Sequence, residues 1–341
     1  MLKKMIGIFF LVFAIVLFLS VLLAISKNPE GVSYGIIPSL IVFFVLFFDV
    51  LSFCFLFSGR PSKARFILLF SVVFITTGLM VGYFLMMAYV NEQLKERDYT
   101  GVYNDCHKIW AARGLVVEGP NITPDGTQNS IESIRLAFAK GAMGTEVDHY
   151  YDVNKKEFIV SHDRPYNLKK GGLLTLEELF SETGEDGYFW LDFKKLRHLN
   201  EHEIKTAVQR LDAIAPGDLR KRIYVEGEDP VNLSFFRRAG FNTIMDTHPL
   251  SDKNPFAPMV INLYKALFYF GDFAVMAMNY GEINNPIYGS NTQQLMSNIP
   301  VFIYHVADDS ELLADLLGLA SVRVVLMQNH SLNRYGVGAC Q

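Results

Sequence analysis

The sequence predicts a (β/α)8 barrel preceded by three transmembrane helices, and two observations indicate this fold class. The first ninety residues hold long apolar runs, whereas the rest of the chain alternates short apolar runs with amphipathic segments. Eight short runs, most of them separated by helical patterns over about 235 residues, are typical of parallel strands surrounded by helices. We therefore divide the chain into a transmembrane region, residues 1–95, and a barrel domain, residues 96–341.

The transmembrane region contains three apolar runs, Met5–Ile25, Tyr34–Phe57 and Phe66–Val90. Each is long enough to cross a hydrocarbon core of about 30 Å. A cleaved signal peptide would explain the first run, but it has no clear small-residue cleavage site and two further runs follow it. The chain is therefore predicted to be an integral membrane protein in contact with a lipid bilayer.

The basic residues beside these runs predict their orientation. Lys3 and Lys4 precede the first run, and Arg60, Lys63 and Arg65 lie between the second and the third. Because basic loops stay in the cytoplasm, the N-terminus is predicted to be cytoplasmic. Three crossings then place the barrel domain outside the cytoplasm, in the periplasm or the extracellular space.

Composition excludes one class of partner and suggests a crosslink. The 341 residues carry a formal net charge of −4, so no basic excess points to nucleic acid. Cys106 and Cys340 lie at the two ends of the barrel domain, in a compartment that permits disulfides. We expect them to pair.

The barrel domain is predicted to contain helices at Ser130–Lys140 and Glu201–Ile214, the first begun by Asn129 with Glu132 three residues later. The apolar segment Asn254–Phe270 is either a membrane-facing lid or a buried helix. The eight candidate strands are His107–Arg113, Met143–His149, Tyr188–Lys194, Arg222–Gly227, Asn242–Thr247, Phe273–Tyr280, Pro300–Val306 and Val322–Gln328.

The second candidate strand ends in two carboxylates, Glu146 and Asp148, which share one face because side chains alternate along a strand. The chain then turns and returns as a second apolar run that ends in His162. If the hairpin is centred near Lys155, His162 lies opposite Asp148. The pattern predicts two oxygen ligands and a proton-transfer group at one place.

Other strand ends add to this group, because the carboxyl ends of barrel strands converge on one site. The third strand contributes Asp192 and Lys194, and the first contributes Ala112 and Arg113. Three carboxylates suit Ca²⁺ or Mg²⁺, which prefer oxygen ligands. Arg113 and Lys194 supply positive charge for a phosphate.

In these motifs the chain resembles the glycerophosphodiester phosphodiesterase family, whose pattern runs H-R-G, E-N-T, E-x-D, H-D and E-x-K, with W-T-V-N near the end. The resemblance covers about residues 108–328. The corresponding residues here are Ala112-Arg113-Gly114, Gln128-Asn129-Ser130, Glu146-Val147-Asp148, His162-Asp163, Asp192-Phe193-Lys194 and, in degraded form, Tyr304-His305-Val306-Ala307.

The resemblance implies that Glu146, Asp148 and Asp192 bind the metal and that His162 is the second of the family's two acid–base histidines. Ala112 stands where the family has the first histidine, so one catalytic group is missing. His107 and His149 are expected to face away from the site. His305, near the end of the seventh strand, is the remaining histidine that could reach it.

These observations predict a membrane-anchored, metal-dependent phosphodiesterase that hydrolyses glycerophosphodiesters or (lyso)phospholipid headgroups. With alanine at position 112, whether natural or introduced, this chain is expected to be impaired. Two alternatives stay open. One is a non-catalytic protein that binds lipid headgroups or phosphate in the same pocket, and the other is a structural partner of a second membrane protein.

Overall fold

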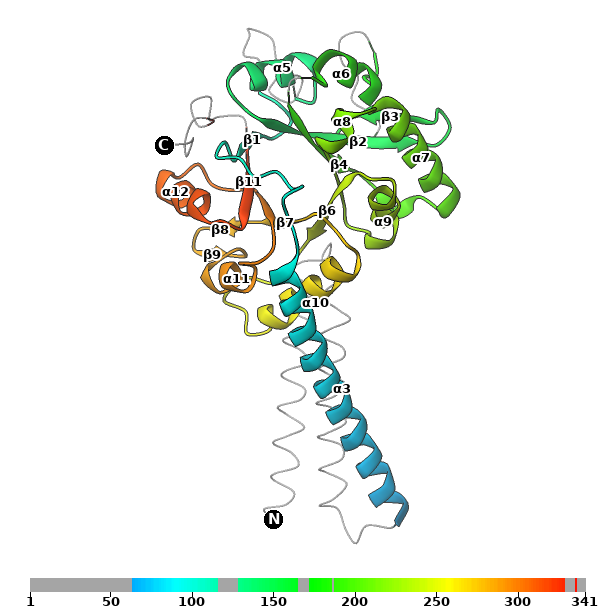
Figure 1. Cartoon of the computed structure of the whole chain (residues 1–341), viewed down its shortest axis with the longest axis vertical. Coiled ribbons are helices and arrows are strands. Elements are labelled where there is room, and N and C mark those ends of the chain that lie inside the picture. Colours follow the sequence, from blue (N-terminus) through cyan, green and yellow to red (C-terminus); the bar gives the residue numbers. More distant parts are fainter. Residues whose placement is uncertain (1–62, 116–127, 165–171, 186, 329–334, 336–341) are drawn as a thin grey trace. The chain divides into compact units, whose positions relative to one another are not determined.

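The computed structural model describes residues 63–115, 128–164, 172–185, 187–328 and 335 (Figure 1). These residues divide into two compact units. The first contains helix α3 (Lys63–Glu96) as far as Lys95, with His248–Leu250 and Phe256–Ala266, and the second contains Glu96–Thr247, Ser251–Pro255 and the described residues from Leu267 onward.

Eight parallel strands of the described residues close into a barrel in the second unit (Figure 1). Strand β1 pairs with both β11 and β2, and this double pairing closes the ring. The prediction of a (β/α)8 barrel is confirmed, and every strand ends within a few residues of its predicted bounds. The strands are β1 (Ile109–Ala111), β2 (Gly144–Asp152), β4 (Tyr188–Phe193), β5 (Ile223–Gly227), β6 (Asn242–Thr247), β7 (Val275–Asn279), β10 (Val301–Tyr304) and β11 (Val322–Met327).

Aromatic side chains fill the barrel interior. The ring of Phe302 lies 5.4 Å from that of Trp110, 5.3 Å from that of Trp190 and 5.2 Å from that of Tyr224, centroid to centroid. Such pairs contribute about 0.5–1.5 kcal/mol each beyond burial. At Gly144 a Cβ atom would lie 2.4 Å from the Trp110 ring, so only glycine fits there. The interior is therefore a packed core, and a site can form only at the strand ends.

Helices cover the barrel, and capping residues set where they begin. Asn200 accepts hydrogen bonds from the amides of His202 and Glu203, so α7 begins at Glu201 as predicted. Thr175 and Glu178 cap α6 reciprocally. The described helices that lie wholly in the second unit are α5 (Ile131–Ala139), α6 (Leu176–Thr183), η2 (Leu196–His198), α7 (Glu201–Ile214), α8 (Asp218–Lys221), α9 (Pro230–Arg238), α11 (Ser290–Leu295) and α12 (Ser310–Gly318). A short hairpin joins β8 (Gly281–Glu282) to β9 (Asn285–Pro286), and α10 (Ala257–Phe270) begins in the first unit.

The hairpin of β2 with β3 (Glu157–Val160) forms as predicted, but its register differs by one residue. His149 pairs with Val160, and the Ser161 amide donates to the Asp148 carbonyl at 3.0 Å. Ser161, not His162, therefore lies opposite Asp148, and the predicted register was wrong.

The turn explains the difference. Asp152 and Glu157 form the last pair, so four residues separate the strands and the hairpin is not centred on Lys155. The Asp152 carboxylate accepts from the amides of Asn154 and Lys155, both at 3.1 Å. Lys156 adopts a positive φ of 55°, which completes the turn.

The first unit joins the end of α3 to the first part of α10. Asn262 on α10 donates a hydrogen bond to the Tyr83 hydroxyl of α3 at 3.3 Å. The segment predicted as a lid or a buried helix forms α10, in which Val260 and Ile261 are buried and Phe270 is exposed.

No helix among the described residues is long and apolar enough to cross a membrane. The predicted spans Met5–Ile25 and Tyr34–Phe57 lie outside the described residues, and the third, Phe66–Val90, falls within α3. Cys106 is disulfide-bonded, whereas its expected partner Cys340 lies outside the described residues.

Candidate active site

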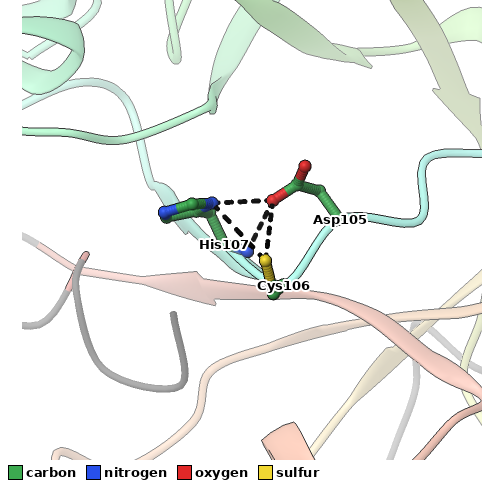
Figure 2. A group of neighbouring side chains, drawn as sticks. All are labelled: Asp105, Cys106 and His107. Carbon is green, nitrogen blue, oxygen red and sulfur yellow. Dashed lines mark hydrogen bonds and ion pairs between the residues drawn. The ribbon is translucent and has the colours of Figure 1, made fainter. Parts of the chain in front are cut away.

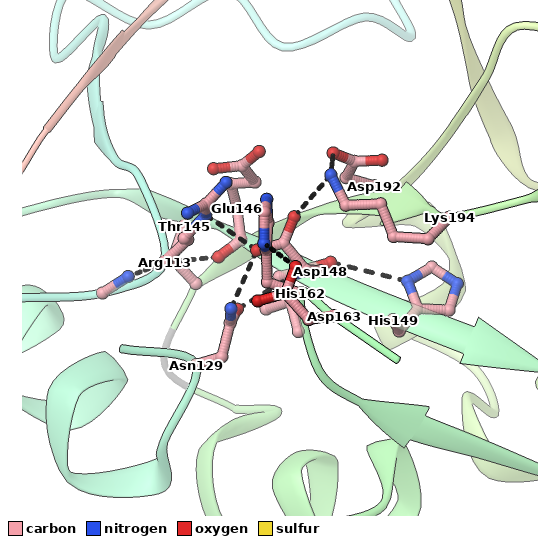
Figure 3. Close-up of polar contacts among 12 residues, drawn as sticks. Arg113, Asn129, Thr145, Glu146, Asp148, His149, His162, Asp163, Asp192 and Lys194 are labelled. Carbon is pink, nitrogen blue, oxygen red and sulfur yellow. Dashed lines mark hydrogen bonds and ion pairs between the residues drawn. The ribbon is translucent and has the colours of Figure 1, made fainter. Parts of the chain in front are cut away.

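Three carboxylates meet at the carboxyl ends of two neighbouring strands (Figure 3). Glu146 and Asp148 come from β2 and Asp192 comes from β4, in a register that pairs Asp148 with Asp192. One oxygen of each lies within 4.8 Å of the other two. The structure thus brings together the three residues that the sequence suggested as metal ligands.

Asp148 is fully buried, and three polar side chains lie against its carboxylate. Its Oδ2 lies 2.7 Å from Arg113 Nε and 2.8 Å from Asn129 Nδ2, and its Oδ1 lies 2.8 Å from Lys194 Nζ. Burial raises the pKa of Asp148, but the charges of Lys194 and Arg113 outweigh it and hold that pKa below its usual value. Asp148 is therefore ionised at neutral pH.

Asn129 has a different role from the one predicted. The N-cap residue of α5 is Ser130, which forms a capping box with Ser133. Asn129 therefore does not cap the helix. Its positive φ of 53° instead turns the side chain toward Asp148, whose amide donates to Asn129 Oδ1 at 3.1 Å. The two residues hold each other through two hydrogen bonds, and Asn129 positions the carboxylate.

The backbone after β1 explains the Arg-Gly sequence. Arg113 and Gly114 have φ values of 60° and 79°. At Gly114 a Cβ would lie 2.5 Å from the Ser133 hydroxyl and 2.7 Å from the Ser133 carbonyl carbon, so another residue would collide with α5. This tight turn directs Arg113 toward Asp148.

At Glu146 and Asp192, burial and the neighbouring acids outweigh the nearby positive charges. Burial, followed by the charges of Asp148 and Asp192, raises the pKa of Glu146 to about 8. Burial likewise raises the pKa of Asp192 to about 7, although its ion pair with Lys194 opposes the rise. The residue Glu146 is 9% exposed. Its carboxylate accepts no hydrogen bond from any residue that the structure describes.

A divalent cation fits this group. Three carboxylates and two bases leave one negative charge in excess when all are ionised, and among the described residues no ion pair is formed by Glu146. A hard cation prefers oxygen ligands of this kind and would remove the cost of burying that charge. Glu146, Asp148 and Asp192 would hold it.

His162 and Ala112 have different surroundings. His162 Nδ1 is 2.9 Å from Asp163 Oδ1, and its side chain is 41% exposed. Ala112 directly follows β1 and is buried in the apolar core with Trp190 and Phe302. The position that corresponds to the family's first histidine thus carries no polar group.

The two histidines expected to face away do so. His149 is buried outside the barrel between the rings of Phe158 and Phe193, and burial lowers its pKa to about 3. His107 contacts Asp105 at 2.7 Å beside Cys106 (Figure 2). Because Cys106 is disulfide-bonded, this second group offers no thiolate for a metal.

Two further acids at the strand ends, Glu226 on β5 and Asp246 on β6, were not predicted as site residues. Glu226 Oε2 accepts from Trp190 Nε1 at 2.6 Å, and Asp246 Oδ1 accepts from the Tyr304 hydroxyl at 3.2 Å. Burial, followed by the charges of Asp192 and Asp246, raises the pKa of Glu226 well above its usual value. The same strand-end rule, applied to all eight strands instead of the first three, would have found both acids.

No family model matches the sequence, and no curated protein does. Solved structures with a similar fold include a glycerophosphodiester phosphodiesterase from Parabacteroides distasonis, with 18% identity, a TM-score of 0.48, and coverage of 66% of this chain and 94% of that one. Another is a provisionally named glycerophosphodiester phosphodiesterase from Galdieria sulphuraria, with 14% identity, a TM-score of 0.48, and coverage of 64% and 92%. These identities and TM-scores are too low to assign a function, which has to come from the side chains of the site.

Proposed function

We propose that this chain is a divalent-metal phosphodiesterase of the glycerophosphodiester phosphodiesterase type, acting on glycerophosphodiesters or (lyso)phospholipid headgroups. One observation carries the proposal. Three carboxylates, Glu146, Asp148 and Asp192, converge with Arg113 and Lys194 at the carboxyl end of the barrel. Acids that can hold a cation, beside bases that can hold a phosphate, suit a phosphodiester.

The protein's own residues would orient the substrate. Ca²⁺ or Mg²⁺, when bound, supplies positive charge that neutralises the phosphate oxygens. Arg113 uses Nε on Asp148, so its terminal nitrogens remain for a phosphate oxygen. Burial lowers the pKa of Lys194, but Asp192 and Asp148 outweigh it and hold that pKa above its usual value. Both bases therefore stay charged.

His162 is the proton donor of the proposed reaction. Asp163 Oδ1 lies 2.9 Å from Nδ1 and can accept its hydrogen, so Nε2 is the nitrogen that we assign to the substrate. As the bond from phosphorus to the leaving alcohol breaks, the alcohol oxygen takes the proton from Nε2. The nucleophile is a water or a substrate hydroxyl, and its proton would go to a base at position 112.

Ala112 cannot take that proton, so the proposed enzyme is impaired at this step. Loss of a general base typically costs about 10²–10⁴-fold in rate. The burial of Ala112 in the apolar core is the specific observation that favours the second candidate function, a pseudoenzyme that binds a phosphodiester or lipid headgroup without hydrolysing it.

We also propose that residues 1–95 anchor the protein in a lipid bilayer, with a cytoplasmic N-terminus and an extracytoplasmic barrel. The support is the sequence of three apolar runs with basic residues before the first and after the second. The exposed apolar side chains of α3, among them Leu79, Phe84 and Leu85, are compatible with a lipid environment.

Restoring the missing histidine tests the proposal. The full chain, in lipid nanodiscs with Mg²⁺ or Ca²⁺, is incubated with glycerophosphocholine and lysophosphatidylcholine, and hydrolysis is followed by phosphorus NMR. Ala112→His should raise the rate by about 10²–10⁴-fold, and adding His162→Ala should remove the gain. Chelation of the metal should abolish hydrolysis by both proteins.

The outcomes separate the two candidate functions. A folded Ala112→His protein that binds these phosphodiesters but turns none of them over would support the pseudoenzyme. Hydrolysis by the unmodified chain at ordinary enzyme rates would show that our assignment of the missing base is wrong.

A further inference from the structure

His305 lies at the carboxyl end of β10, directly after Tyr304, and the proposed mechanism gives it no role. Its backbone has a positive φ of 53°, which is uncommon for a residue other than glycine. The imidazole is exposed to solvent and lies within electrostatic range of Arg113, Lys194 and Asp246. A strained backbone thus holds a histidine at the edge of the phosphate site.

Asn279, the last residue of β7, fixes one nitrogen of this imidazole. Its Oδ1 accepts from the Gly281 amide at 2.7 Å. Because a backbone N–H can only donate, this contact settles which end of the Asn279 side chain is the oxygen. The other end, the Nδ2 amino group, lies 3.0 Å from His305 Nδ1.

The contact determines the tautomer of His305. An amino group is a donor, so Nδ1 has to accept with its lone pair, and the hydrogen of the neutral ring is on Nε2. Partial desolvation, and then the charge of Arg113, lower the pKa of His305 against the opposite effect of Asp246, which supports the neutral form. No described residue forms a hydrogen bond with Nε2.

His162 differs from His305 in this respect. Its Nδ1 faces a carboxylate, Asp163, which accepts a hydrogen bond, so Nδ1 of His162 carries a hydrogen. His305 Nδ1 faces an amide donor, so it accepts and its hydrogen is on Nε2. The two rings therefore differ in which nitrogen is fixed as the donor.

We propose that His305 contacts the phosphate of the substrate, donating a hydrogen bond from Nε2–H to a phosphate oxygen, and that Asn279 positions it by fixing the tautomer. This inference rests on the proposed function only in that the ligand is a phosphate group. His305 does not replace the base missing at Ala112, because the lone pair of its neutral ring is on Nδ1 and already accepts from Asn279.

Binding of inorganic phosphate tests the inference without requiring hydrolysis. The full chain, labelled with ¹⁵N-histidine and supplied with Mg²⁺ in detergent micelles, is titrated at pH 7.5 while the ring nitrogens are followed by NMR. His305 should show a bare Nδ1 and a protonated Nε2, and phosphate should shift the Nε2–H signal. His305→Ala should weaken phosphate binding about tenfold or more, the loss expected for a hydrogen bond to a charged group.

Three variants distinguish a donor from a base and from a structural role. His305→Gln keeps a neutral N–H but cannot take a proton, so it should bind phosphate more tightly than His305→Ala. Asn279→Ala should leave a mixture of tautomers and weaken binding less than His305→Ala does. His202→Ala, at an exposed position on α7, is the matched control and should bind phosphate like the unmodified chain.

A protonated Nδ1 in the unliganded protein, or unchanged phosphate binding by folded His305→Ala, would overturn the inference. If His305→Gln is no better than His305→Ala, the donor role is wrong. Hydrolysis assays of the unmodified chain report separately on the proposed function, since a chain that never hydrolyses a diester can still bind phosphate through His305.

Discussion

The acids on the two sides of the barrel mouth have different partners. On the side formed by β1, β2 and β4, Asp148 faces two permanent cations, Arg113 at 2.7 Å and Lys194 at 2.8 Å. On the side formed by β5 and β6, Glu226 accepts from the neutral indole of Trp190, and Asp246 accepts from the hydroxyl of Tyr304.

The comparison shows that the neighbours of a buried acid decide its charge. The pKa of Asp148 is lowered although the residue is fully buried, because two cations outweigh burial. The pKa of Glu226 is raised because burial and other acids act together, and a neutral donor compensates little. Charge is thus concentrated where a metal ion and a phosphate would bind.

Among the substitutions that test this difference, Asp148→Asn should reduce the stability of the protein most. The change removes the negative charge with which both Arg113 and Lys194 form ion pairs. It leaves these two partly buried cations without that partner. We expect the free energy of unfolding to fall by about 3–5 kcal/mol, the cost of breaking a buried ion pair. Urea unfolding of the full chain measures the loss, and Ca²⁺ or Mg²⁺ should no longer stabilise the variant.

Asp246→Asn is the control, because its acid accepts from a neutral hydroxyl and belongs to the other side. If both variants lose the same stability, the two sides do not differ as described.

The raised pKa values of Glu146 and Asp192 should make the stability of the protein depend on pH. Folding raises the pKa of Glu146 from 4.5 to about 8 and that of Asp192 from 3.8 to about 7. The folded state therefore binds more protons between these values, so its stability falls as pH rises through 7 and 8. In chelator, the melting temperature should be about 3–8 °C lower at pH 9 than at pH 6.

Glu146→Gln should remove most of this slope, because a neutral amide does not titrate. The part of the slope near pH 7 should remain, because Asp192 still titrates there. An unchanged slope near pH 8 in Glu146→Gln would assign the effect to other groups.

Glu226→Gln should have the smallest effect. Its raised pKa favours the neutral acid, and a glutamine oxygen can still accept from Trp190. We expect the free energy of unfolding to change by less than about 1 kcal/mol at pH 6, within the range of conservative substitutions. A loss as large as that of Asp148→Asn would mean that Glu226 carries a charge that the protein needs.

The barrel and its strands could be predicted from sequence because apolar runs and helical patterns alternate strongly along residues 109–327. Strand alternation placed Glu146 and Asp148 on one face, and the convergence of strand ends in a barrel added Asp192. Both are regular properties of backbone geometry, and they need no knowledge of loops.

The predictions that were wrong concern residues in turns. The hairpin register slipped by one residue because the predicted turn was centred on Lys155, whereas Asp152 and the positive φ of Lys156 set a four-residue loop. Asn129 reads as a helix cap by residue type, yet its backbone conformation turns it toward Asp148. Neither conformation is encoded in hydrophobic periodicity.

The tautomer of His305 could not be predicted either. It depends on the side chain of Asn279, the last residue of β7, whose orientation is fixed by the amide of Gly281 at the start of β8. Such contacts between strand ends become visible only when the barrel has closed.

Titration calorimetry of the metal-stripped full chain with Mg²⁺ and Ca²⁺ tests the central claim most directly. Repeating it at pH 7 in buffers of different ionisation enthalpy measures the protons released with each ion. Because Glu146, with a pKa of about 8, must lose its proton to become a ligand, we predict one ion per chain and release of about one proton or more. Glu146→Gln should bind more weakly and release fewer protons. Absence of binding at millimolar concentrations, or binding unchanged in Glu146→Gln and Asp148→Asn, would contradict a metal site at these carboxylates.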